Sequence, residues 1–172
     1  AAGNAAIQVT RVVNVTTPFT AVAGDIIITE ILKNPTGTDG NGEYFEIYNN
    51  TPVDIDINGW TIKDADTDSH VIDNGGPLQI LVGGYLTLGV NSDTAINGGI
   101  NHDYIYSGIT LANGSDEVII EDPNGTVVDQ VFYDSGYPNP NGPTMQLDLN
   151  SLSATDNDTG SNWCPSDTEF GT

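Results

Sequence analysis

Short runs of alternating apolar and polar residues follow one another along most of the chain. Residues 26–32 and 43–48 are the clearest predicted strands, because isoleucine, aromatic and other strand-favouring residues dominate both. In the second run, Phe45 and Ile47 fall on one face, while Tyr44, Glu46 and Tyr48 fall on the other. This pattern predicts a sheet that packs on one side and meets water on the other.

Other strands are predicted wherever such a run is bounded by Gly, Pro, Asn or Asp. We expect them at residues 7–15, 54–57, 60–63, 70–72, 78–82, 85–90, 103–106, 116–121, 126–133 and 144–148. Two pairs of neighbouring runs have turn residues between them and are expected to form hairpins. These are 78–82 with 85–90, about Gly83-Gly84, and 116–121 with 126–133, about residues 122–125.

The remaining segments are expected to be irregular. The loop at residues 34–42 contains three glycines, and residues 150–172 are polar, with Trp163 expected to pack on the body of the protein. No segment has the periodicity of a helix of ordinary length. The chain is therefore predicted to be all-β, a sandwich or a barrel.

The composition narrows the range of partners. The chain has 172 residues and a formal net charge of -21, with only three Lys and Arg residues (Arg11, Lys33 and Lys63). Such a surface lacks the basic groups that bind phosphates, so nucleic acid is excluded as a partner, as are anionic lipids. The charge agrees with a solvated acidic surface or with cation binding.

No apolar run is long enough to span a bilayer, so direct membrane insertion is not expected. Because the chain begins without Met, we expect it to be part of a longer multidomain chain. Cys164 is the single cysteine, and it is expected to be a small buried residue near Trp163, with a nucleophile as the weaker alternative.

An acidic loop is the sharpest local candidate for a site. Asp64, Asp66 and Asp68 alternate along it, and alternate carboxylates can converge on Ca²⁺, which takes six to eight oxygen ligands. An EF-hand is rejected, because the sixth position is Ser69 and the twelfth is Gly75. The alternatives are a calcium loop of another kind and a plain acidic turn.

A second candidate is the pair Glu30 and Glu46. If residues 26–32 and 43–48 pair as a hairpin, these carboxylates lie opposite or diagonal to each other. They would then form an acid/base pair or a metal site, or they would serve only to hold the structure. The seven tyrosines suggest a third candidate, an exposed patch that recognises sugars or proteins.

Several motifs in a fixed order carry a family resemblance. Gly-Glu-Tyr-Phe-Glu-Ile-Tyr-Asn at residues 42–49, followed by Asp-Ile-Asn-Gly-Trp-Thr-Ile-Lys-Asp at 56–64, resembles the lamin tail domain. The segments 28–35, 78–88, 111–129 and 162–163 resemble further parts of the same family, also in its order. The resemblance implies an immunoglobulin-like antiparallel β-sandwich, for which we expect about 8–10 strands. It covers roughly residues 25–165, after an N-terminal strand and linker at 1–24 and before a tail at 166–172.

The resemblance also implies a role. Bacterial members look like accessory domains of secreted or cell-surface proteins, so an extracellular or surface location is expected. The chain is then a binding or tethering module with no catalytic residues and no required cofactor, whose ligand is a protein or a carbohydrate. Two alternatives remain open: a hydrolase domain using Glu30 and Glu46 or a metal, and a stalk unit stabilised by calcium.

Overall fold

The computed structural model describes residues 19–166, and these form twelve strands, one short helix and two single 3₁₀ turns. The strands are β1 (Ile26–Leu32), β2 (Tyr44–Asn49), β3 (Ile55–Asp56), β4 (Thr61–Lys63), β5 (Ser69–Val71), β6 (Gln79–Ile80), β7 (Tyr85–Gly89), β8 (Tyr104–Ile105), β9 (Asp116–Glu121), β10 (Val127–Tyr133), β11 (Met145–Leu147) and β12 (Trp163–Pro165). The helix is α1 (Asp39–Gly42), and the 3₁₀ turns are η1 (Leu149–Ser151) and η2 (Gly160–Asn162). The predicted strand at residues 7–15 lies outside the described residues.

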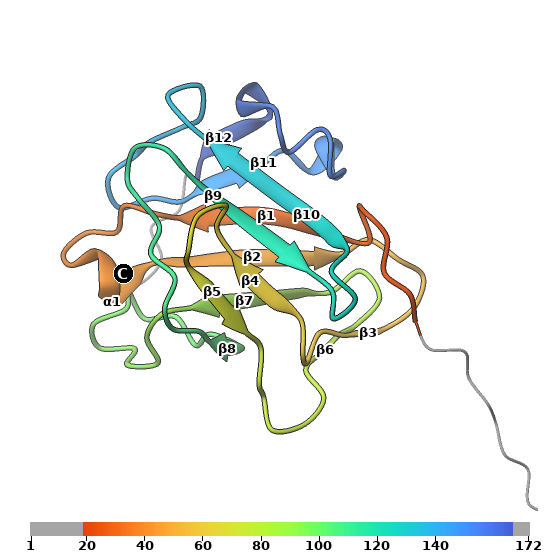
Figure 1. Cartoon of the computed structure of the whole chain (residues 1–172). Coiled ribbons are helices and arrows are strands. Elements are labelled where there is room, and N and C mark those ends of the chain that lie inside the picture. The colour runs from red at the N-terminus through yellow and green to blue at the C-terminus, as the bar shows by residue number, and fades with distance from the viewer. Residues whose placement is uncertain (1–18, 167–172) are drawn as a thin grey trace, which may run out of the picture.

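The strands form two main sheets that lie face to face (Figure 1). The first sheet has the order β12-β11-β1-β2-β7-β8, and the second has the order β10-β9-β4-β5. A small pair, β3-β6, lies beside them. All pairs are antiparallel except β7 with β8. The prediction of an antiparallel immunoglobulin-like sandwich is confirmed, and short additional strands take the count above the expected range.

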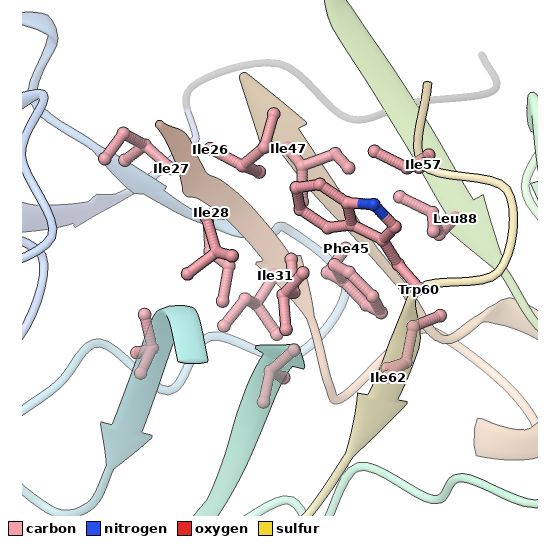
Figure 2. Packing of buried hydrophobic residues seen from close by; sticks show 14 of the residues in the cluster. Ile26, Ile27, Ile28, Ile31, Phe45, Ile47, Ile57, Trp60, Ile62 and Leu88 are labelled. Carbon is pink, nitrogen blue, oxygen red and sulfur yellow. The ribbon is translucent and has the colours of Figure 1, made fainter. Parts of the chain in front are cut away.

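The core lies between the two sheets and consists mostly of branched aliphatic side chains. Trp60 stands among Ile47, Ile57 and Leu88, all of which are buried (Figure 2). Burying an isoleucine side chain contributes about 1.5–3 kcal/mol, so this layer is the main source of stability. Among residues 19–166, no helix is long and apolar enough to cross a membrane.

Two hairpin predictions have opposite outcomes. The hairpin of β9 and β10 is confirmed, with its turn closed by the Gly125 N–H donating to the carbonyl of Asp122. The prediction of a hairpin about Gly83-Gly84 is wrong, because β6 pairs with β3 and β7 pairs with β2. Asn49 explains the difference. Its side-chain amide donates to the carbonyls of Ile80 and Leu81, which binds the chain between β6 and β7 to the end of β2.

Three smaller expectations also need correction. The loop at 34–42 contains the single turn α1, closed by the Glu43 N–H donating to the Asp39 carbonyl at 3.1 Å. The C-terminal segment, expected to be irregular, contributes β12, which pairs with β11 and buries Trp163 as predicted. Cys164 is exposed, not buried, because its neighbour Trp163 takes the inward position on this strand.

Candidate functional site

Glu30 and Glu46 are the only predicted pair that the fold brings directly together. In the register of β1 with β2, Glu30 lies opposite Glu46, while Ile28 lies opposite Ile47 and Ile31 opposite Phe45. The two glutamates therefore share the face of the first sheet that is turned away from the second sheet, which we call the outer face. The prediction that they face each other across a hairpin is confirmed.

A β-bulge at Thr29 makes this arrangement. Strict alternation would place Glu30 on the same side as Ile28, but the register shifts between these two residues. The extra residue, Thr29, turns its hydroxyl to Glu46, donating to Oε1 at 2.9 Å. Because of the bulge, Glu30 points outward while Ile28 and Ile31 both stay in the core.

The bulge is held from the opposite sheet by Asp129 of β10. Asp129 Oδ2 accepts from the Ile28 N–H at 2.6 Å and from the side-chain amide of Asn157 at 2.7 Å. Both of these polar residues are buried, with Asp129 2% and Asn157 0% exposed. Burial is the main cause that raises the pKa of Asp129 to about 7, against the lowering effect of its hydrogen bonds.

The two glutamates have different surroundings. Glu30 is 4% exposed and accepts from the Tyr44 hydroxyl at 2.5 Å. Burial raises its pKa, while the hydroxyls of Tyr44 and Thr144 act in the other direction. The pKa of Glu46 is raised to about 7, mainly by burial and further by the charges of Glu30 and Asp103.

A hollow opens over these carboxylates. It is lined by Thr29, Glu30, Glu46, Tyr85, Gln146, Leu147 and Leu149, and its volume is about 340 Å³. We call it the groove. Its rim is apolar and accessible, because Leu149 is 68% and Tyr85 43% exposed. The ring of Tyr85 also packs against that of Tyr48 at a tilt of 41°, with 4.8 Å between ring centroids.

The other end of the outer face is closed. Tyr44, expected on the wet side, is buried, since the ring of His102 lies over it with 5.2 Å between centroids. Only glycine at position 89 allows this cover, because a Cβ there would lie 2.3 Å from the His102 ring. Burial lowers the pKa of His102, so the ring covers the sheet in its neutral form at neutral pH.

The predicted calcium ligands lie in a turn that is also bonded to other parts of the chain, since Asp68 Oδ2 accepts from the Thr110 N–H at 3.3 Å. Asp64 Oδ1 accepts from the backbone N–H groups of Asp66 and Asp68, each at 2.9 Å. Within residues 19–166, no three His, Cys, Asp or Glu side chains are grouped in a way that could hold a metal ion. Asp64, Asp66 and Asp68 therefore lie near one another in a loop, and their binding of calcium stays a prediction.

Sequence reasoning missed other buried polar groups. Glu43, 2% exposed, accepts from the Leu111 N–H at 3.3 Å, and burial raises its pKa to about 7. Lys33 is equally buried, with its ammonium 4.2 Å from the centre of the Tyr133 ring. Both are closed from solvent at one end of the sandwich, so we assign them to the structure. Of the groove residues, Gln146 and Leu149 carried no signal in the sequence, since only pairing of β11 with β1 brings them there.

The fold and the outer face together define a class. Two stacked, mainly antiparallel sheets around one core are typical of immunoglobulin-like modules. The model of the lamin tail domain family matches residues 20–135, and the chain belongs to this family. The lamin tail domain is a non-enzymatic, immunoglobulin-like structural domain. No curated protein matches the chain, so no named relative adds to this assignment.

Proposed function

We propose that this chain is a non-catalytic binding and tethering module of a larger secreted or cell-surface protein, and that it binds its partner in the groove. The observation that carries the proposal is the accessible rim of Tyr85 and Leu149 around a floor of two carboxylates, of which Glu30 is buried and Glu46 partly exposed. Large apolar side chains that stay exposed beside a hollow are typical of binding surfaces.

The acidic surface supports an extracellular, soluble module. A charge of -21 keeps such a domain in solution and away from nucleic acid and anionic lipid. The lamin tail family supports an accessory role, since its members are structural domains. The partner in this proposal is a protein or a carbohydrate, and the chain needs no cofactor to bind it.

The experiment is to probe the intact chain against arrayed peptides and arrayed oligosaccharides. Variants Tyr85→Ala and Leu149→Ser remove the rim of the groove, and we expect them to abolish binding. Matched controls remove equally exposed side chains elsewhere: Phe132→Ala, from a residue 47% exposed, and Leu81→Ser, from one 61% exposed. Equal losses in the rim and control variants, or no binding to either array, would overturn the proposal.

A hydrolase is the second candidate, and one observation favours it. The groove brings two carboxylates together, and one of them, Glu46, has its pKa raised to about 7, as an acid/base pair requires. The assay is hydrolysis of aryl glycosides by the wild-type chain and by Glu46→Gln. Turnover that this substitution abolishes would replace the binding proposal with the enzymatic one.

A further inference from the structure

Three carboxylates follow one line across the first sheet. The register places Gln146, Glu30, Glu46 and Thr87 side by side on β11, β1, β2 and β7. Asp103 comes next, since its Oδ2 accepts from the N–H of Thr87 at 2.8 Å. We call Glu30, Glu46 and Asp103 the carboxylate row; it starts in the groove and runs at right angles to the strands.

The described residues supply no cation to this row. Lys63 is paired with Glu121 on the second sheet, and the buried Lys33 stands against Tyr133. The three carboxylates therefore repel one another, and the charges of Glu30 and Asp103 contribute to the raised pKa of Glu46. A cation that enters the groove removes this repulsion, so the row favours a positively charged occupant.

The spacing of the row suits several cations better than one. Neighbouring strands are about 4.8 Å apart, so the row extends over three strand spacings, roughly 14 Å, from Glu30 to the position of Asp103. A single metal ion needs its oxygen ligands within about 2.6 Å, and no metal-binding group of three is present in residues 19–166. Alternate side chains of an extended peptide are roughly 7 Å apart, which matches a row of separate acidic groups.

The apolar rim of the groove can pack against the apolar stem of a basic side chain. Lysine and arginine have long apolar stems that pack on apolar surface while the charged head meets a carboxylate. Leu149 and the packed rings of Tyr85 and Tyr48 offer such a surface beside Glu46. A tyrosine ring also attracts a cation placed over its face.

We propose that the groove and the carboxylate row bind an extended basic segment of a partner protein, with lysine or arginine side chains placed over the three carboxylates. This inference rests on the proposed binding function and names its partner. The charge of -21 steers such a segment toward the domain from a distance. The close contacts at the row then provide the specificity.

The test uses the peptide Lys-Thr-Lys-Thr-Lys-Thr and its fully acetyl-lysine counterpart, at physiological ionic strength to screen non-specific attraction. We expect the lysine peptide to bind and the acetylated one not to bind. Glu30→Gln with Glu46→Gln should weaken binding about tenfold or more, because both close charges are lost. Asp66→Asn with Asp68→Asn removes the same charge from the acidic loop and should weaken it by about twofold or less.

Two further measurements keep the test decisive if the double variant folds poorly. Carbodiimide cross-linking of the lysine peptide to the wild-type chain should join it to Glu46, Glu30 or Asp103. Calorimetry at pH 7 in two buffers of different ionisation enthalpy should show net proton release. Burial raises the pKa of Glu46 to about 7, and Glu30, Tyr85 and Asp103 face it across the strands. A bound cation lowers this pKa, so Glu46 releases its proton on binding.

The outcomes separate this inference from the proposed function. If the lysine peptide fails but a neutral peptide or an oligosaccharide binds and is lost in Tyr85→Ala, the inference is wrong and the binding function stands. If no probe depends on the rim, both fail. Equal weakening by the two double variants, scattered cross-links, or competition by millimolar calcium would each overturn the inference.

Discussion

Asp129 and Glu46 are both carboxylates whose pKa is raised to about 7 by burial, yet they occupy very different places. Asp129 lies between the sheets and accepts from Ile28 and Asn157, two donors that belong to the structure itself. Glu46 receives one hydroxyl, that of Thr29, and otherwise borders the groove. A raised pKa alone therefore does not identify a functional group, whereas the direction in which the carboxylate points does.

The two positions are also linked. Asp129 satisfies the backbone N–H of Ile28 at the bulge, and the bulge turns Glu30 outward against Glu46. The interior carboxylate thus helps to shape the groove without lining it.

Asp129→Ala should destabilise the domain most. It leaves two buried donors without an acceptor, which costs roughly 2–4 kcal/mol in the free energy of unfolding. Thermal or urea unfolding measures this cost. The matched control is Asp54→Ala, at an exposed residue whose Oδ1 accepts from the Val82 N–H. If both variants melted at the same temperature, Asp129 would not have the structural role assigned to it.

Stability should fall as the pH rises from about 5 to 8. A carboxylate whose pKa is higher in the folded state binds protons more tightly there, so folding is favoured most below that value. Asp129, Glu46 and Glu43 each have a folded pKa raised to about 7, and their contribution is lost as the pH passes through it. Unfolding midpoints at constant ionic strength measure this slope.

The pH slope also has a matched control. Asp129→Asn and Glu46→Gln should each flatten it, because each removes one of the titrating groups. Asp66→Asn, at an exposed residue in the acidic loop, removes the same charge and should leave the slope nearly unchanged. A slope that all three variants flatten equally would reflect the overall negative charge instead.

Glu46→Gln should leave stability unchanged or raise it by less than about 1 kcal/mol at pH 8, because it removes repulsion at a partly exposed site. The same variant should weaken binding of the lysine peptide, though less than the double variant with Glu30→Gln does. This combination of retained stability and weakened binding differs from the large loss of stability that we expect for Asp129→Ala. A large loss of stability in Glu46→Gln would place Glu46 with the structural carboxylates.

Calcium should have the smallest effect. An ion bound by Asp64, Asp66 and Asp68 at about 100 times its dissociation constant would add about 2.7 kcal/mol. We expect a much smaller shift of the melting temperature on adding millimolar calcium and then excess chelator, since Asp64 already accepts from two backbone groups. A clear shift that Asp66→Asn with Asp68→Asn abolishes would confirm the calcium site.

Much of the fold could be predicted from the sequence. Strand-favouring residues at 26–32 predicted β1, alternation at 43–48 predicted β2, and Asp-Pro-Asn-Gly at 122–125 predicted the turn of the β9–β10 hairpin. These features are local, because side-chain alternation and turn chemistry depend on neighbours in the chain. The same local signals failed at Gly83-Gly84, where the distant residue Asn49 decides the pairing.

The candidate site also has features that the sequence predicted and features that it did not. The all-β class, the acidic surface and the two strands that carry Glu30 and Glu46 could all be predicted from the amino-acid sequence. That these two side chains share the outer face could be seen only in the folded chain. That outcome depends on an extra residue at Thr29, and the N–H that the bulge frees on Ile28 is satisfied by Asp129, 101 residues away in the chain. No periodic pattern in the sequence predicts so distant a partner, because the contact arises only when one sheet packs against the other.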